Sequence, residues 1–146
     1  SLGSGPLVSA EGVIGATLTG FTLDGATRAN GIEVSAGSVA INFVRNIVRD
    51  AVTGLFVDGA SSSVTVVNSN FVHNISGIFG NTCAASGLDI RNTVFAYNAS
   101  EGLHYGAACS GNHNYNLFWE NGNDLNDAPA AAELFLNPRF EDPERN

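Results

Sequence analysis

The chain has 146 residues, the size of one domain; it is 44% hydrophobic and 14% charged, with a formal net charge of −8. An acidic chain whose few basic residues are scattered is poorly suited to nucleic acid, because phosphate binding depends on neutralisation by Lys and Arg. No apolar run approaches the ~20 residues that cross a bilayer, and the hydrophobic content is too high for a disordered chain, so we expect a folded domain with neither a nucleic acid nor a membrane as partner.

The chain opens with residues 1–12, which carry no repeat and are expected to form an extended lead-in. The first residue is Ser1 rather than methionine, which indicates a processed or excised product.

Residues 13–123 repeat with a period of about 24 residues. One marker is a bulky apolar residue with Asn or Asp three positions later, and a second is glycine followed by an aliphatic residue. The apolar residues of the first marker are Phe21, Ile47, Phe71, Phe95 and Phe118, and their polar partners are Asp24, Asp50, Asn74, Asn98 and Asn121. The aliphatic residues of the second marker are Ile32, Leu55, Ile78 and Leu103.

Each repeat holds about three short stretches of period-2 alternation separated by Asn, Gly and Ser, which is typical of short strands. A helical period is absent, apart from a short candidate segment at residues 128–136. Short strands that repeat in this way bury their apolar faces by coiling and stacking turn on turn. The pattern therefore predicts an all-β parallel β-solenoid of about five rungs. A leucine-rich repeat fits less well because the leucines are scattered, and the six-residue period of hexapeptide solenoids is missing.

Segments such as "VTVVNSNFVHNISGIFG" and "LDIRNTVFAYNASEGLHYG" resemble the right-handed parallel β-helix repeats of the pectate-lyase-like superfold. The later "NYNLFWENGNDLNDAPAAAELFLNPRFEDP" resembles the closing segment of secreted bacterial β-helix proteins. The resemblance implies a right-handed parallel β-helix over 13–123, a capping tail over 124–146 and an extracellular or cell-surface location. It says little about activity, because one fold carries many functions.

Equal positions in successive rungs stack, so the Asx residues Asp24, Asp50, Asn74, Asn98 and Asn121 are expected to form one hydrogen-bonded column at a bend. Their apolar partners and the aliphatic residues of the second marker should form two core columns. Asn74 and Asn98 also stand in glycosylation sequons, but an inward ladder position would hide the acceptor amide.

One residue beyond the aliphatic column, the alternation places Glu33, Phe56, Phe79 and His104 on the outer surface. This exposed column is our candidate binding site, as a platform for stacking sugars or as a protein contact. The alternative is that the phenylalanines only shield the sheet.

Cys83 and Cys109 fall at nearly the same place on adjacent rungs, and the rung spacing matches the Cα separation of a disulfide. We expect an extracellular disulfide, in preference to free thiols or a metal site.

Pectate-lyase-like enzymes act on acidic polysaccharides with basic or clustered acidic groups, but the "NTD", "DD", "GHG" and "RIK" strings of polygalacturonases are missing. Asp89 and Arg91 are expected to form a surface ion pair. The histidines do not suggest a catalytic group either. His73 is expected to share a mixed column with Arg49, Tyr97 and Glu120. His104 lies too far from Glu33 for proton transfer, and His113 is expected in a polar turn. Oxygen ligands at Glu120, Asn123, Asp124 and Asp127 fit a solvated capping turn better than calcium. We therefore expect no catalytic residue, metal or cofactor.

The sequence favours a non-catalytic extracellular structural or surface module, an adhesin, or a unit that joins copies of itself or a neighbouring domain through the solenoid ends. The alternative is a carbohydrate-binding or lyase-like polysaccharide-degrading β-helix protein. An ice-binding surface is disfavoured because Thr17, Thr19 and Thr22 do not recur in later repeats.

Overall fold

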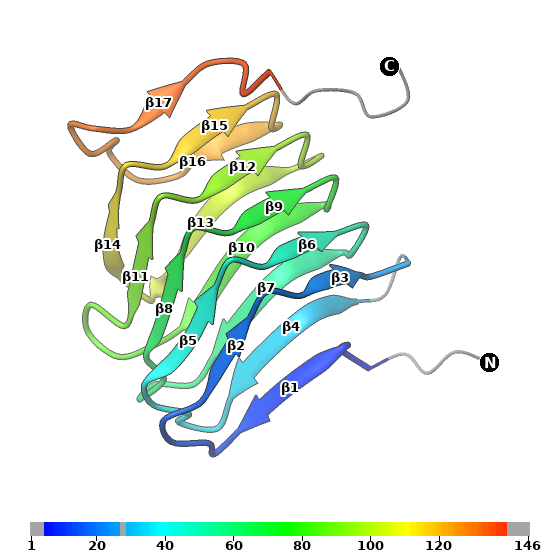
Figure 1. Cartoon of the computed structure of the whole chain (residues 1–146). Helices are drawn as coiled ribbons and strands as arrows, with labels where there is room; N and C mark the ends of the chain where they lie inside the picture. Colours follow the sequence, from blue (N-terminus) through cyan, green and yellow to red (C-terminus); the bar gives the residue numbers. More distant parts are fainter. Residues whose placement is uncertain (1–4, 27–28, 140–146) are drawn as a thin grey trace.

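The computed structural model describes residues 5–26 and 29–139 and contains strands and no helices in those ranges. Three parallel sheets run along a solenoid of about five turns, so the predicted all-β solenoid is confirmed (Figure 1). Within the described ranges no helix has the length and hydrophobicity needed to cross a membrane.

Each turn of the solenoid contributes one strand to each sheet, except the last, whose described residues pass from sheet 1 to sheet 3 without a strand in sheet 2. Sheet 1 contains β1 (Val8–Glu11), β4 (Asn30–Ser35), β7 (Thr53–Asp58), β10 (Ser76–Thr82), β13 (Glu101–Ala108) and β16 (Asn123–Leu125). Sheet 2 contains β2 (Thr17–Thr19), β5 (Ile41–Val44), β8 (Val64–Val67), β11 (Leu88–Arg91) and β14 (Gly111–Asn114). Sheet 3 contains β3 (Thr22–Asp24), β6 (Ile47–Arg49), β9 (Asn70–Val72), β12 (Val94–Ala96), β15 (Leu117–Trp119) and β17 (Leu134–Phe135).

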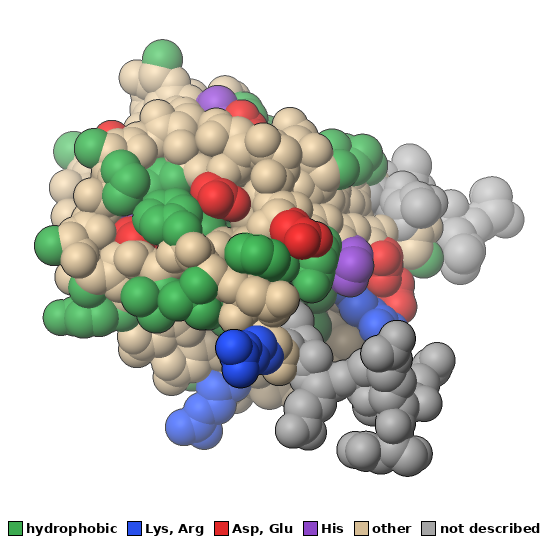
Figure 2. Space-filling view, turned by 90° about the horizontal axis from the view of Figure 1, so that it is seen from above, with side chains coloured by type: hydrophobic (Ala, Val, Ile, Leu, Met, Phe, Trp, Pro, Cys, Tyr) green, Lys and Arg blue, Asp and Glu red, His purple; other side chains and the backbone are tan. Residues whose placement is uncertain are grey.

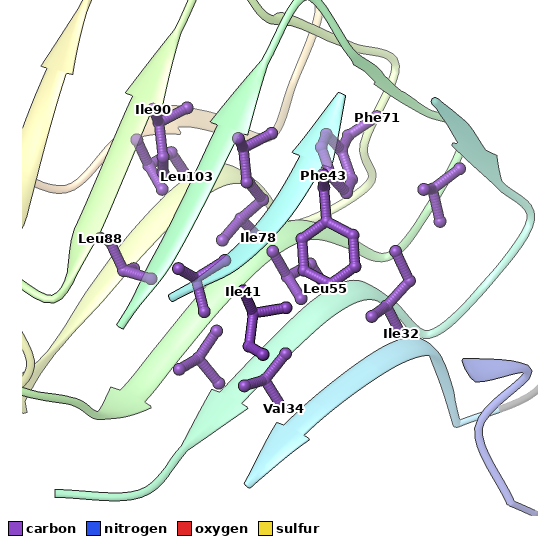
Figure 3. Packing of buried hydrophobic residues seen from close by; sticks show 14 of the residues in the cluster. Ile32, Val34, Ile41, Phe43, Leu55, Phe71, Ile78, Leu88, Ile90 and Leu103 are labelled. Atoms are coloured by element: carbon purple, nitrogen blue, oxygen red, sulfur yellow. The ribbon is translucent and has the colours of Figure 1, made fainter. Parts of the chain in front are cut away.

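The core lies inside the three sheets, where alternate side chains of the central strands pack together (Figure 3). The predicted aliphatic column is present, because Ile32, Leu55, Ile78 and Leu103 are in register and fully buried. A second column stacks the rings of Phe71, Phe95 and Phe118. Phe135 extends this stack, with its ring centroid 5.4 Å from that of Phe118.

The first two members of the predicted aromatic column are wrong. Phe21 is 53% exposed and Ile47 is 38% exposed, and both point outward. The register pairs Val48 with Phe71, and Leu23 with Val48, so these two aliphatic residues continue the core column. In a strand, a slip of one residue exchanges the buried face for the exposed one, and the adjacent Ile47 and Val48 fit the sequence pattern equally well. In the first repeat the displacement is two residues, from Phe21 to Leu23.

The glycine marker has a steric cause. A Cβ on Gly54 would lie 2.6 Å from the carbonyl oxygen of Gly77 in the next turn and 2.7 Å from Cδ1 of Phe71. The equivalent Gly31 would meet the carbonyl oxygen of Gly54 at 2.8 Å. Successive turns approach too closely here for any side chain, so glycine recurs with the rung.

The solenoid begins before residue 13, within the segment expected to be an extended lead-in, because β1 pairs with β4 from Val8 onward. At the other end, β16 pairs with β13 and β17 pairs with β15, so strands continue past residue 123. The first four residues of the expected lead-in and residues 140–146 of the expected tail lie outside the described residues.

Candidate binding surfaces and the groups that could do chemistry

Three asparagines form a hydrogen-bonded ladder where each turn passes from sheet 3 to sheet 1. The side-chain oxygen of Asn98 accepts the Asn74 backbone N–H at 3.1 Å, and that of Asn121 accepts the Asn98 N–H at 3.1 Å. The Asn98 amide also donates to the Phe71 carbonyl oxygen at 3.0 Å. These bonds satisfy buried backbone groups at the bend, as the predicted Asx column required.

Asp24 and Asp50 do not belong to this ladder, contrary to the prediction. Both are exposed, and Arg49 pairs with them at 3.0 Å and 3.6 Å. The inward place is taken by Ala51, whose N–H donates to Asn74. Asp50 precedes it in the left-handed conformation, where its side chain turns outward.

The two sequon asparagines are buried, with Asn74 2% and Asn98 0% exposed. Their side-chain amides donate within the ladder. A glycan on either nitrogen would require the bend to open.

A second polar ladder, missed from the sequence, lies between sheets 2 and 3. It consists of buried Asn46, Ser69, Thr93 and Asn116. Asn46 accepts the Phe21 N–H at 3.0 Å, Ser69 accepts the Asn46 N–H at 3.2 Å, and Asn116 accepts the Thr93 N–H at 3.0 Å. The signal was a small polar residue recurring with the repeat period, which could have been read beside the Asx marker.

Glu133 terminates this second ladder. Its carboxylate is fully buried, and it accepts from the Asn116 backbone N–H at 2.8 Å and from the Asn116 side-chain amide at 3.2 Å. The same carboxylate lies 2.9 Å from Nδ1 of His113. Glu133 therefore occupies the acceptor position that the asparagine of a further turn would fill.

His113 was expected in a polar turn, and this is wrong. It lies in β14, in register with buried Ile90, and its side chain is only 6% exposed. Beside it, burial raises the pKa of Tyr105, and the nearby charges of Asp127 and Glu133 raise it further. The Tyr105 hydroxyl is buried and has no hydrogen-bond partner among the described residues.

The predicted outer column is in register on sheet 1: Glu33 pairs with Phe56, Phe56 with Phe79, and Phe79 with His104. All four side chains are half-buried. The ring centroids of Phe79 and His104 are 4.5 Å apart at an interplanar angle of 4°, and those of Phe56 and Phe79 are 6.0 Å apart at 25°. Because neighbouring rings overlap, they turn edges rather than faces to solvent.

The surface around this column is acidic. Glu11, Glu33, Asp58 and Glu101 occupy outward positions of sheet 1, whose described strands contain no arginine. Two of the acids are anchored: Glu33 accepts from the Asn30 amide at 2.9 Å, and Glu101 lies 2.8 Å from Nδ1 of His104. The surface offers hydrogen-bond acceptors and negative charge.

A shallow groove of about 330 Å³ runs beside sheet 1, along the turn from sheet 3. Its lining includes Asp50, His73, Ile75 and Tyr97. The rings of His73 and Tyr97 are stacked 5.0 Å apart. The sequence predicted Arg49 as the residue that stacks with His73 in the preceding turn, but the equivalent residue is Asp50. The backbone shows this, because one residue in each turn adopts the left-handed conformation here: Asp50, His73, Tyr97 and Glu120.

Arg91, Asp89 and Asp124 are engaged in structural contacts. Nε of Arg91 donates to Asp89 at 2.9 Å, and this hydrogen bond, together with the Asp89 charge, raises the pKa of Arg91. Asp124, from the segment considered for calcium, accepts from the Asn121 amide at 2.8 Å. The described residues contain no group of three or more His, Cys, Asp or Glu placed to hold a metal ion.

The predicted disulfide between Cys83 and Cys109 is present, with a Cα–Cα distance of 4.7 Å. It joins the turn after β10 to the turn after β13, so it ties adjacent rungs together.

Comparison of the chain with protein-family models, with curated proteins and with solved structures finds no match.

Proposed function

We propose that the chain is a non-catalytic, extracellular structural module that presents its sheet surfaces for contact. The observation that carries the proposal is how its polar groups are used: two interior ladders and the carboxylate of Glu133 bind backbone and amide groups of the solenoid itself. A disulfide across adjacent rungs is in keeping with an extracellular location.

Charged pairs that resemble acid–base constellations also have structural partners. Asp89 and Arg91 bind each other on the surface of sheet 2, and Glu101 binds His104 beside the aromatic column. A catalytic acid or base must reach a substrate proton at hydrogen-bond distance and be poised to exchange it. Groups that are already bonded to neighbouring side chains in a packed ladder are better suited to holding the structure rigid than to exchanging a proton with a substrate.

The proposal is tested by incubating the protein with polygalacturonate and other acidic polysaccharides, with and without calcium, and measuring unsaturated or reducing uronate ends. We expect no release. Release that disappears in Asp89→Asn or Arg91→Gln, but persists in the exposed control Glu120→Gln, would overturn the non-catalytic proposal.

A carbohydrate-binding role is the second candidate, favoured by the column Phe56, Phe79 and His104 with acceptors on both sides. Its chemistry points to neutral sugars, because four outward carboxylates repel uronate or sulfate groups. The hydroxyls of a neutral chain would donate to these carboxylates, while its C–H surfaces contact the ring edges.

Affinity electrophoresis in gels that contain neutral or acidic polysaccharides tests this second candidate. We expect retardation by at least one neutral polymer, and loss of retardation in Phe79→Ala. Phe21→Ala is the matched control, since Phe21 is exposed outside sheet 1. Retardation by polygalacturonate alone, or equal behaviour of the two variants, contradicts binding of neutral sugar at this column.

Association through the solenoid ends, with a neighbouring domain or with another copy, is also proposed. At the first turn, Val8, Leu18 and Leu23 are only half-buried against the core. Figure 2, viewed towards the C-terminal end, shows hydrophobic side chains gathered there, and Phe135 is 48% exposed. Head-to-tail contact between copies predicts open-ended fibres by light scattering and electron microscopy. Particles that never exceed a closed dimer would exclude stacking of copies.

A further inference from the structure

The outer surface of sheet 3 is apolar over most of its length. The parallel register places its outward positions in two adjacent columns, whose larger apolar members are Ile47, Val72, Val94, Leu117, Trp119 and Leu134. The polar members are Thr22, Asp24 and Arg49 in the first two strands and Asn70 in the third. Ile47 and Leu134 are 38% and 49% exposed, and the other four are half-buried.

Ala96 shows that these side chains pack into a layer. It follows core residue Phe95 and therefore points outward, and it does not belong to the core cluster, yet it is fully buried. Its register partners on the two sides are Val72 and Trp119. We attribute its burial to these larger neighbours, which leaves their own outer surfaces facing solvent.

No other described element lies over this side of the solenoid (Figure 1). Sheet 2 differs, because its outward residues include Thr17, Asn42, Thr65 and Asn112 and offer little apolar surface. Contiguous exposed apolar surface on a folded domain commonly marks an interaction site.

Charge distribution favours a second copy as the partner. The chain carries a net charge of −8, so two copies repel wherever unpaired carboxylates meet. Sheet 1 carries four outward carboxylates and no arginine in its described strands, whereas the outward Asp24 of sheet 3 pairs with Arg49 at 3.0 Å, and Arg49 also lies 3.6 Å from Asp50. Sheet 3 therefore carries less uncompensated negative charge than sheet 1, and copies of this chain meet less like-charge repulsion there.

The available area sets the strength of the contact. Strands of three residues span ~10 Å, and six strands at the spacing of a parallel sheet extend ~25 Å. The sheet therefore offers a projected area of ~250 Å² per partner before the flanking turns are added, well below the ~800 Å² of standard stable interfaces. The area supports a weak dimer.

We infer that two copies dimerise by packing their sheet 3 surfaces face to face about a two-fold axis, in the manner of a β-sandwich. Trp119 and its aliphatic neighbours then form the dry centre of the interface, and the Asp24–Arg49 pair lies at its rim. This dimer is closed, so it differs from head-to-tail stacking, and it leaves sheet 1 free.

Sedimentation velocity of the full chain, from low micromolar to millimolar concentration, tests the inference with two matched variants. Val94 and Val67 are both half-buried valines that face outward, on sheets 3 and 2 respectively. We expect the wild-type chain to form a dimer, Val94→Glu to weaken it by at least about tenfold, and Val67→Glu to leave it unchanged. Added salt should strengthen the dimer by screening repulsion between acidic copies.

Thermal melting of both variants verifies that the solenoid is intact. A wild-type chain that stays monomeric at all concentrations would overturn the inference, as would equal weakening by the two glutamate variants. Because the interface lies away from sheet 1, Phe79→Ala should dimerise as wild type does, which separates failure of the dimer from failure of glycan binding.

Discussion

Glu133 offers the sharpest test of how the solenoid ends. Replacing it with alanine removes the acceptor for three donors: the backbone N–H of Asn116, its side-chain amide, and Nδ1 of His113. Each buried donor left without a partner costs about 1–3 kcal/mol. Truncation at the last turn of the solenoid would let water solvate some of these donors, so we expect Glu133→Ala to destabilise this turn by about 3 kcal/mol, toward the low end of the sum.

Glu133→Gln should have an intermediate effect of about 1–2 kcal/mol, because glutamine retains one acceptor oxygen but turns an NH2 group toward a donor. The exposed Glu120 provides the control, and Glu120→Ala should stay within about 0.5 kcal/mol of wild type.

Native-state hydrogen exchange is the appropriate assay, because stacked repeats open locally at their ends. The amide of Leu134 donates to the Asn116 carbonyl oxygen at 2.9 Å and reports directly on attachment of the cap. We expect its protection, and that of the Asn116 amide, to fall in the order wild type, glutamine, alanine. Equal protection in Glu133→Ala and Glu120→Ala would refute the assignment of Glu133 as the ladder terminus.

Three further predictions follow from the packing. Gly54→Ala should destabilise the solenoid by about 2–3 kcal/mol in urea unfolding, because the new methyl group collides with the Gly77 carbonyl; a wild-type midpoint would show that the turns can separate. Replacing Cys83 and Cys109 with serine should cost about 3 kcal/mol, and wild-type protein in reductant should melt like the double variant; unchanged melting would mean that the bridge constrains little. Burial raises the pKa of Tyr105 in the folded state, so the unfolded state loses this phenol proton at lower pH than the folded state does. The free energy of unfolding should therefore fall above pH ~10, by up to about 1.4 kcal/mol per pH unit. Tyr105→Phe should remove that component without cost at neutral pH, since the hydroxyl has no described partner; an unchanged alkaline slope would contradict this origin.

The repeat period by itself determined the solenoid, the aliphatic core column, the pairing of Cys83 with Cys109 and the alignment of Phe56 with Phe79. All of these depend on a fixed distance in sequence, which a stack of similar turns converts into adjacency in space. If the boundary of a strand in another turn is misplaced by one or two residues, these residues are still predicted to be neighbours.

Only the tertiary structure decided which side chains point inward where the sequence offers two equivalent choices. Ile47 and Val48 are both apolar, and the register against Phe71 places Val48 in the core. Glu133 lies in the tail, outside the repeats, so no periodic signal marks it as the acceptor that ends the ladder at Asn116. The alternation along a strand shows which residues share a face, but it does not show which of the two faces is buried. The packing of each turn on the next decides which face points inward.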